Sequence, residues 1–343
     1  MNWCSCLSPR AQSRGRENYL RIKRSRLRST RQVILKNFYS NGKLLLTGEY
    51  LVLDGAKSLA IPTKFGQDLV VEKIEEPQII WGSFTNTGEC WFEAIFDLPK
   101  LRLVSSTFNS DKEGSAEFIA ETLLEILEEA KRLNPDFLKI DGGFVLKTQL
   151  TFPRNWGLGS SSTLINSIAS WAKVDAFQLL WNSFKGSGYD IACAQNNTPI
   201  FYQIENIKPI INQVEFNPSF KENLFFVFLN QKQDSKEGIA KFRESGADFE
   251  NEIKRVSEIS EEFLSAKSIK DFDKLIVEHE QIISSIIKLK PVKEKLFPDY
   301  FGEIKSLGAW GGDFILATGN DKTPTYFKEK GFETILTYNQ MVL

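Results

Sequence analysis

Histidine is almost absent from this chain of 343 residues, which contains only His279. A hydrolase that uses Ser, His and Asp would have to use this residue. The residue lies between Ile276 and Ile283 in an apolar pattern with helical spacing, so we expect a packed or partly exposed helix histidine. The sequence therefore argues against a serine hydrolase.

Cysteines and long apolar runs are also scarce. Cys4, Cys6, Cys90 and Cys193 are too scattered for a disulfide framework or a zinc site, which favours a reducing compartment and a cytoplasmic location. Runs such as residues 224–229 have the length of a strand and fall far below the roughly 20 residues of a membrane helix. We expect no membrane partner.

The near-zero net charge of −1 hides an asymmetry between the N-terminal segment and the rest. Residues 1–36 contain ten Lys or Arg against one acid, Glu17, which leaves 33 basic and 43 acidic residues in the rest. Such a segment is typical of a transit peptide for organelle import or of a nucleic-acid-binding arm. We favour a third interpretation, a start site misassigned upstream of Asn37 or a disordered tail, because the segment has little apolar periodicity. We expect no nucleic-acid partner.

Two common signatures of phosphoryl transfer are missing. A Walker A loop requires an upstream glycine before Gly-Lys-Ser/Thr, whereas Gly42-Lys43 is followed by Leu44. The His-Arg-Asp and Asp-Phe-Gly signatures of protein kinases are also absent.

A glycine-bearing loop at residues 153–163 is the most informative segment that is present. Gly157 and Gly159 allow close backbone approach to an anion, and a helix that begins at Ser160 would add unpaired amides and a favourable dipole. The segment therefore predicts a phosphate cradle, although an N-capped helix after a glycine turn remains an alternative. Its candidate binding residues are Pro153, Trp156, Gly157, Leu158, Gly159, Ser160, Ser161, Ser162 and Thr163.

Three other segments accompany this loop in a recognisable order. Residues 41–55 place Lys43 and Glu49 at the two ends of an apolar run, and residues 186–192 read Gly-Ser-Gly-Tyr-Asp-Ile-Ala around Asp190. Residues 308–314, Gly-Ala-Trp-Gly-Gly-Asp-Phe, form a third glycine-bearing segment near the C-terminus. Together with the loop, these segments resemble the motifs of the GHMP kinases, named for galactokinase, homoserine kinase, mevalonate kinase and phosphomevalonate kinase. The resemblance covers about residues 38–314.

The resemblance implies an α+β fold with two lobes, an N-terminal ribosomal-protein-S5-like lobe and a C-terminal ferredoxin-like lobe. We assign the lobes to residues 37–205 and 206–343. The length of the chain agrees, because it exceeds what one hydrophobic core usually serves. A homodimer is an open alternative.

The resemblance also implies ATP and Mg²⁺ as cofactors and a small-molecule acceptor. Asp190 is the candidate base for the acceptor proton, and Lys43 the candidate cation at the transferring phosphoryl group. A turn aspartate and a surface lysine are the alternatives for these two residues. Ser161 or Ser160 is the candidate hydroxyl ligand of Mg²⁺. Candidate acceptor contacts are Glu49, Tyr50, Ser187, Gly188 and Tyr189, and candidate nucleotide contacts in the last motif are Gly311 and Gly312.

Several roles stay open at this stage. Glu49 is predicted either to position Lys43 or the substrate, or to act in a helix cap or an ion pair. The loop at residues 308–313 is expected to pack on the phosphate loop through backbone amides, with Trp310 as a departure from the family pattern. Residues 232–235, with Lys232, Asp234 and Ser235, are expected to be a solvated loop.

One departure concerns the metal. Mevalonate-kinase-like members carry a metal-binding glutamate on a helix before the catalytic aspartate, but residues 177–182 here contain no acid. Phosphomevalonate kinases resemble this stretch and the first motif better, which favours mevalonate or phosphomevalonate as the acceptor. A non-catalytic protein of the same fold and a diphosphomevalonate decarboxylase are the alternatives.

Periodicity predicts the secondary structure of the body. Strands are expected at residues 43–54, 67–75, 90–97, 143–150, 199–204, 224–229 and 313–318. Helices are expected at residues 115–133, 160–173, 236–244, 248–266 and 270–289, with Ser115 as the cap of the first.

Overall fold

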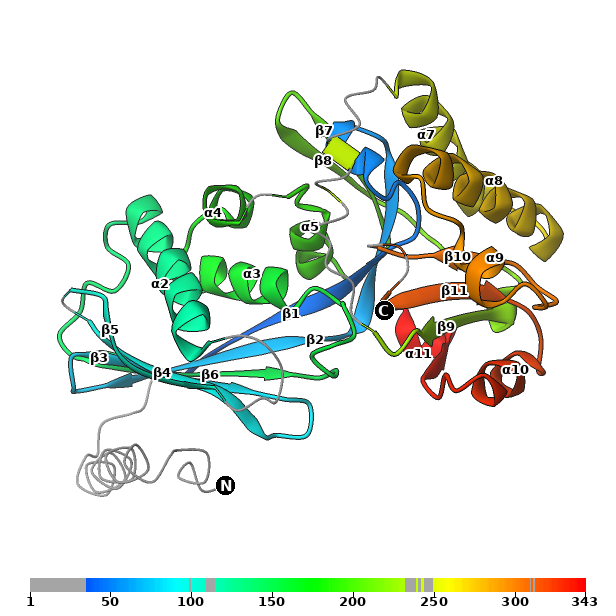
Figure 1. Ribbon diagram of the computed structural model, residues 1–343. Helices are drawn as coiled ribbons and strands as arrows, with labels where there is room; N and C mark the ends of the chain where they lie inside the picture. The colour runs from blue at the N-terminus through cyan, green and yellow to red at the C-terminus, as the bar shows by residue number, and fades with distance from the viewer. Residues whose placement is uncertain are drawn as a thin grey trace. The chain divides into compact units, whose positions relative to one another are not determined.

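The structure is a computed structural model that describes residues 35–98, 100–108, 115–184, 186–231, 239, 242–243, 249–308, 310 and 312–343. Within these residues the chain is a mixed α+β protein (Figure 1). It divides into two compact units. Unit 1 contains the described residues up to Tyr39 together with Gln67–Thr151 and Ser167–Ser183. Unit 2 contains Ser40–Gly66, Phe152–Asn166 and the described residues from Phe184 to Leu343.

Unit 1 is a mixed sheet with helices on one face (Figure 1). The strand order is β5-β4-β3-β6-β2, and only the β3–β6 pair is parallel. Buried and partly exposed residues alternate along β4, as expected for a sheet with one face covered. The elements are β2 (Ser58–Ile74, which enters unit 1 at Gln67), β3 (Gln78–Phe84), β4 (Cys90–Asp97), β5 (Arg102–Phe108), β6 (Gly143–Leu150), α2 (Ala116–Leu133), the end of α3 (Ser160–Ala172) and α4 (Ala176–Ser183).

Helix α2 shows how the local sequence sets an element of this unit. Ser115 has extended backbone dihedrals, and its hydroxyl accepts the Phe118 N–H at 3.0 Å, which confirms the predicted N-cap. The buried residues of the helix recur three and four positions apart, so that one face packs inward: Ala120, Leu123, Ile126, Leu127 and Ala130.

Unit 2 contains a second sheet with the antiparallel order β10-β11-β9-β12. Every residue of β9 is buried, because packed side chains cover both faces of this strand. The elements of this sheet and its helices are β9 (Leu224–Phe228), β10 (Ile304–Ser306), β11 (Phe314–Thr318), β12 (Ile335–Thr337), η3 (Lys221–Asn223), α7 (Glu250–Ser265), α8 (Ile269–Ile287), α9 (Val292–Leu296), α10 (Thr323–Glu329) and α11 (Tyr338–Met341).

The rest of unit 2 carries the segments with candidate chemistry. The first part of β2 pairs with β7, and β7 pairs with β8 in a hairpin. The elements are β1 (Leu35–Leu45, in unit 2 from Ser40), η2 (Leu51–Asp54), the start of α3, α5 (Tyr189–Gln195), β7 (Ile200–Glu205) and β8 (Lys208–Gln213).

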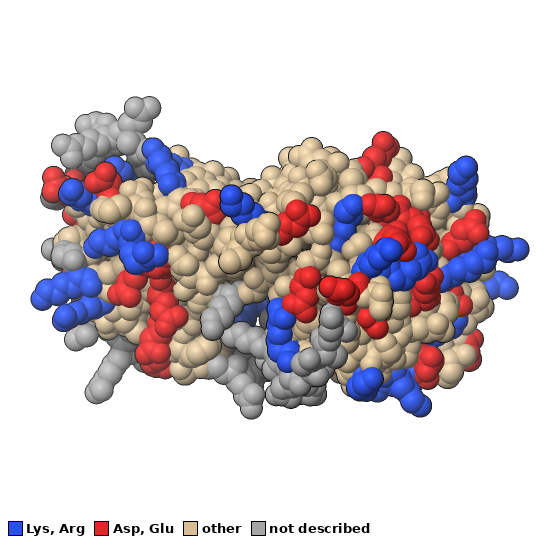
Figure 2. Space-filling model, turned by 90° about the horizontal axis from the view of Figure 1, so that it is seen from above, with Lys and Arg blue, Asp and Glu red and all other residues tan. Residues whose placement is uncertain are grey.

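Charged side chains of both signs are interspersed on the face drawn in Figure 2. On the paired helices α7 and α8, for example, the Arg255 guanidinium contacts the Glu278 carboxylate at 2.6 Å. No described helix is long and apolar enough to cross a membrane.

Most of the predicted elements in the described residues are confirmed to within two or three residues at their ends. The strand predicted at residues 67–75 is part of β2, which begins nine residues earlier at Ser58. The strand predicted at residues 43–54 is wrong, because β1 ends at Leu45 and residues 51–54 form a 3-10 helix. Positive φ angles at Gly48, Tyr50 and Gly55 bend the chain there, and an extended strand does not contain such angles. Elements that the sequence did not predict include β3, β5, β8, β10, β12, α4, α5, α9, α10 and α11.

The compact units also differ from the predicted lobes. A cut between residues 205 and 206 would pass through the β7–β8 hairpin, which lies wholly in unit 2. Of the tail assigned to residues 1–36, residues 1–34 lie outside the described part of the chain, and Leu35 and Lys36 begin β1. The predicted helix at residues 236–244 also falls mostly outside it.

The cap of α2 can be tested directly. Ser115→Ala removes the side-chain acceptor for the Phe118 amide and should lower the free energy of unfolding by about 1 kcal/mol. Chemical denaturation measures the change, with Glu121→Ala at an exposed position of the same helix as the control. Equal stability of the two variants would contradict the capping role.

Candidate active site

Lys43 lies on strand β1 between the buried residues Gly42 and Leu44, and hydrogen bonds at Asn41 and Lys43 fix the strand here. A Cβ at Gly42 would lie 2.7 Å from Thr63 Oγ1, so this position has no room for a side chain. The Lys43 N–H donates to the Leu158 carbonyl at 3.1 Å, which ties the strand to the glycine-bearing loop. Asn41 donates to the Asn196 carbonyl at 2.8 Å. The strand is therefore anchored on each side of Lys43.

The Lys43 ammonium group brings two of the sequence motifs together. Its Nζ lies 3.4 Å from Asp190 Oδ1 and donates to the Gly157 carbonyl at 3.2 Å. It also lies 5.4 Å from the centre of the Tyr189 ring. The Lys43 and Asp190 side chains are 14% and 23% exposed, so a ligand can reach both. The structure thus joins the two residues that the sequence predicted as catalytic.

Charges around Lys43 keep it in its ionised form. Burial lowers the pKa of Lys43, but the neighbouring Tyr189, Asp190 and Asp313 outweigh this effect and raise that pKa well above its usual range. The pKa of Tyr189 is raised by burial and by Asp190, against the opposing effect of Lys43. An ammonium group therefore faces the site at neutral pH.

Helix α5 presents Asp190 in its first turn. Gly188 precedes the helix with φ +91°, a conformation that favours glycine. Ser187 is buried, and its carbonyl accepts a hydrogen bond from the Tyr202 hydroxyl. The buried residues of this helix are Ile191, Ala192, Cys193 and Ala194. Of the predicted acceptor contacts, Gly188 and Ser187 thus shape the turn that carries Asp190.

The glycine-bearing loop forms a turn that leads directly into α3. The Trp156 N–H donates to the Pro153 carbonyl at 3.0 Å, and Leu158 is fully buried. The Thr163 N–H donates to the Gly159 carbonyl, and its hydroxyl donates to the Ser160 carbonyl at 2.9 Å. Thr163 is buried, and its two hydrogen bonds stabilise the first turn of the helix.

The start of α3 is suited to bind an anion. The helix begins at Ser160, so the amides of its first residues have no partner within the helix. Ser161 is exposed, and Ser160 and Ser162 are half-buried. These amides and hydroxyls fit a phosphate group.

Both glycines of the loop are required by their neighbours as well as by their backbone conformation. Gly159 has φ +86°, and a Cβ there would lie 3.2 Å from the Lys43 side chain. Gly157 has φ +68°, and a Cβ there would lie 2.3 Å from the Asp313 carboxyl carbon. The Asp313 side chain therefore packs directly on the loop.

Trp156 is held by an aromatic cluster. Its ring meets those of Phe65 and Phe314 edge to face, with centres 5.2 and 5.3 Å apart, and that of Phe228 at 6.4 Å. These contacts hold the loop on the strand β11 side of unit 2.

The predicted backbone contacts between the last glycine-bearing segment and the loop stay a prediction, because Ala309 and Gly311 of this segment lie outside the described residues. The segment's described contact with the loop is the Asp313 side chain, whose carboxyl group lies against Gly157. Trp310 is buried in an apolar cluster that includes Tyr50. Gly312 is buried, and the predicted contact at Gly311 lies outside the described residues.

Glu49 and Tyr50 are buried rather than presented to an acceptor. Glu49 Oε1 accepts from Lys305 Nζ at 2.7 Å, and the Tyr50 ring packs 5.9 Å from that of Phe242. The ion-pair alternative for Glu49 therefore matches the structure. Sequence reasoning missed Lys305, because β10 is a strand of only three residues, Ile-Lys-Ser, that no predicted element or motif included.

No cluster of three or more His, Cys, Asp or Glu suited to a metal occurs among the described residues. The Mg²⁺ role of Ser161 or Ser160 stays a prediction, and α4 carries no acid at residues 177–182. His279 is buried on α8, which confirms the expected packed histidine. Lys232, Asp234 and Ser235 lie outside the described part of the chain.

Comparison by sequence finds no protein-family model and no curated protein that matches the chain. Comparison by structure finds kinases. The Methanococcus jannaschii mevalonate kinase matches with a TM-score of 0.62 and 18% identity over 90% of this chain and 98% of its own. The Streptococcus pneumoniae phosphomevalonate kinase in complex with phosphomevalonate and AMPPNP matches with a TM-score of 0.61 and 15% identity over 88% of this chain and 99% of its own. The Lactococcus lactis galactokinase matches with a TM-score of 0.59 and 14% identity over 94% of this chain and 97% of its own. The chain has the fold of the GHMP kinases.

The buried Glu49–Lys305 pair yields a stability prediction. Lys305→Met leaves the Glu49 carboxylate buried without its cation and should lower the free energy of unfolding by about 3–5 kcal/mol, measured by denaturant titration. Lys274→Met serves as the control, because Lys274 pairs with Asp271 on the surface of α8 at 3.2 Å. A surface pair contributes about 0–1 kcal/mol, so similar losses in both variants would contradict the argument.

Proposed function

We propose that this chain, with the fold of the GHMP kinases, is an ATP-dependent kinase that phosphorylates a small-molecule alcohol. The observation that carries the proposal is the Lys43–Asp190 pair beside the Gly157 carbonyl. This pair puts a cation and a carboxylate next to a loop suited to phosphate.

The glycine-bearing loop and the start of α3 fit the phosphates of ATP. Gly157 and Gly159 have no side chains of their own and adopt the positive φ angles of the loop, and the α3 amides supply donors. The Ser160 or Ser161 hydroxyl and the Asp313 carboxylate are the oxygen donors that fit Mg²⁺ in this region. Bound Mg²⁺ would supply positive charge to the phosphate oxygens.

Asp190 and Lys43 have complementary roles in the proposed reaction. Asp190 accepts the proton of the acceptor hydroxyl, and the acceptor oxygen forms a bond to the γ-phosphorus of ATP. The bond between that phosphorus and the β–γ bridging oxygen breaks, and ADP leaves with the electron pair. The Lys43 ammonium stabilises the negative charge that develops in the transition state.

We propose mevalonate or phosphomevalonate as the acceptor. The Gly-Lys-Leu-Leu and Gly-Glu-Tyr sequences of the first motif support this choice, as does the Asp190-Ile-Ala sequence. The structural likeness to mevalonate and phosphomevalonate kinases is compatible with it. Because a galactokinase has the same fold, the acceptor has to be tested directly.

The test is ADP release with mevalonate, phosphomevalonate, homoserine and galactose as separate acceptors. We expect turnover with one of the first two. Release of CO₂ from diphosphomevalonate would instead identify a decarboxylase. Nucleotide binding without turnover on any acceptor would identify a non-catalytic protein.

Asp190→Asn should abolish turnover while ATP binding persists. The amide keeps the shape of the carboxylate but cannot accept the proton, so kcat should fall by at least about 10²-fold. Steady-state kinetics and nucleotide titration measure the two effects, with the exposed Asp141→Asn as the control. Near-normal turnover of Asp190→Asn would remove this residue from the mechanism.

Lys43→Met should lower kcat more than it raises KM for ATP. The ammonium acts on charge that develops in the transition state, and loss of such a donor costs about 10²–10³-fold in kcat. The exposed Lys131→Met on α2 controls for loss of a positive charge. Weaker ATP binding with an unchanged kcat would make Lys43 a ground-state phosphate ligand instead.

A further inference from the structure

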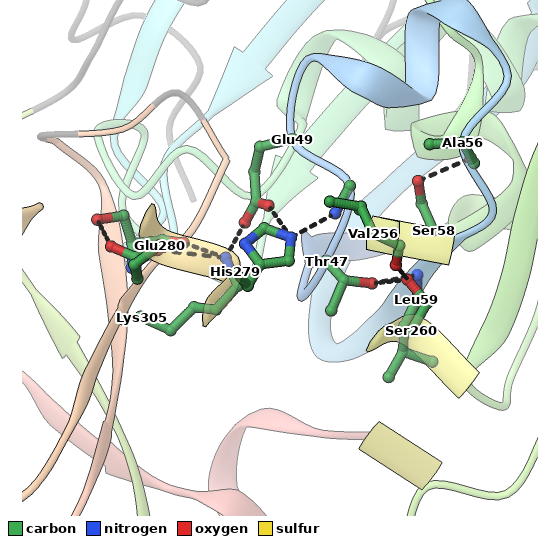
Figure 3. Close-up of polar contacts among 12 residues, drawn as sticks. Thr47, Glu49, Ala56, Ser58, Leu59, Val256, Ser260, His279, Glu280 and Lys305 are labelled. Atoms are coloured by element: carbon green, nitrogen blue, oxygen red, sulfur yellow. Dashed lines mark hydrogen bonds and ion pairs between the residues drawn. The ribbon is translucent and has the colours of Figure 1, made fainter. Parts of the chain in front are cut away.

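Four ionisable side chains meet in the interior of unit 2: Glu49, His279, Glu280 and Lys305 (Figure 3). We call them the buried charge cluster, because none is more than 3% exposed. They come from the turn after β1, from α8 and from β10. Buried charges are rare unless they are paired, so the cluster calls for a role.

Lys305 lies at the centre of the cluster. Its Nζ donates to Glu49 Oε1 at 2.7 Å and to the Ser306 carbonyl at 2.9 Å, and lies 3.5 Å from Glu280 Oε1. An ammonium group has three N–H donors, and two of them make these hydrogen bonds, with Glu280 Oε1 as the third oxygen neighbour.

His279 adds no charge to the cluster. Its Nε2 accepts the Gly48 N–H at 3.0 Å, which requires an unprotonated nitrogen. Burial and the nearby Lys305 lower the pKa of His279 well below its ordinary value. The ring is therefore neutral and holds the turn before Glu49.

The cluster has one negative charge too many if both carboxyl groups ionise, because Lys305 is its single cation. A surplus charge in the interior is costly, and one added proton removes it. Burial raises the pKa of Glu49 as well as that of Glu280, and Lys305 opposes the effect at both. We place the proton on Glu280, since Lys305 lies 2.7 Å from Glu49 but 3.5 Å from Glu280.

The partners of Glu280 accommodate both of its forms. Oε1 accepts the Ser306 N–H at 3.1 Å, and Oε2 lies 2.8 Å from the Ser306 hydroxyl. A hydroxyl can donate to a carboxylate or accept from a carboxylic acid, so it can follow the change of protonation. Lys305 and Glu49 are the charged groups that act on Glu280, and Tyr50 lies beside Glu49.

The cluster links two segments of the candidate site. Glu49 follows Lys43 by six residues, and Lys305 precedes Asp313 by eight. Tyr50 and Trp310, from the same two segments, share one apolar cluster. The position of Lys305 thus bears on both the Lys43 strand and the segment that packs on the glycine-bearing loop.

We propose that Glu280 is a positioning residue that carries an exchangeable proton. Neutral Glu280 leaves Lys305 bound to Glu49, whereas ionised Glu280 draws Lys305 away and loosens the two segments. The effect on turnover rests on the proposed kinase function, but the protonation of Glu280 does not.

The expected pH dependence has a definite sign. Burial raises the pKa of Glu280 to about 7, with Lys305 opposing and Glu49 reinforcing the effect. The folded protein therefore binds this proton more tightly than the unfolded chain. Its contribution to stability is lost as the pH rises from about the ordinary value of 4.5 through about 7.

The first test is the pH profile of kcat for the wild type and Glu280→Gln. The wild-type kcat should fall by about tenfold between about pH 6 and about pH 8, as for one essential group that titrates at about 7. Glu280→Gln should lose this fall, because the amide stays neutral at every pH. Glu278→Gln, on the exposed face of the same helix, should keep it. A purely structural role would lower kcat equally at all pH values and would overturn the proposal.

The second test needs no turnover. The Tm of Glu280→Gln minus that of the wild type should rise by about 5 °C between about pH 5.5 and about pH 7.5. A difference in Tm that does not change with pH would contradict the protonation of Glu280. A rising difference without a fall in wild-type kcat would overturn the positioning role, and a rising difference in a protein inactive with every acceptor would count against the proposed function alone.

If Glu280→Gln does not fold, infrared spectroscopy of the wild type with ¹³C-labelled glutamate gives the answer. A protonated carboxyl band should persist at about pH 6, where exposed glutamates are ionised, and vanish by about pH 8. The band should also be present in Glu93→Gln, a control that is needed because burial raises the pKa of Glu93 to about 7 as well. Absence of the band at the lower pH would overturn the proposal.

Discussion

The contacts of the Lys43 ammonium set the geometry of the candidate site. A partly buried cation needs oxygen partners, and here they come from the glycine-bearing loop and from helix α5. β1, the loop and the turn before Asp190 must therefore all be in place for Lys43 to be satisfied. Because the Lys43 stem and the Asp313 carboxyl group occupy the space beside Gly159 and Gly157, these glycines serve the packing of the site as well as its backbone shape.

The two central lysines of unit 2 differ in access, and this difference separates their roles. Lys43 is 14% exposed and pairs with a carboxylate that is also partly exposed, so both can meet a ligand. Lys305 is fully buried and pairs with Glu49. The first pair is suited to chemistry on a bound molecule. The second pair holds segments of the protein in place. The neighbouring carboxyl group of Glu280 has no cation of its own, and this makes the cluster responsive to pH.

Predictions from sequence succeeded where the signal was local. The cap at Ser115 and the start of α3 after Gly159 depend on residues within one turn, and both are found in the structure. The strand predicted through residue 54 failed because hydrophobicity alone does not reveal the positive φ angles at Gly48 and Tyr50. The role of Glu49 stayed open because its partner lies 256 residues away.

The sequence by itself determined the glycine-bearing loop, the kinase-like order of its motifs and the choice of Lys43 and Asp190. These follow from turn chemistry, helix-start chemistry and the resemblance that they support. Only the tertiary structure decided that Glu49 pairs with Lys305, that Asp313 packs on Gly157, and that His279 and Glu280 join one buried cluster. The physical reason is that ion pairs and buried hydrogen bonds depend on which distant segments are packed together, and no local pattern encodes that packing.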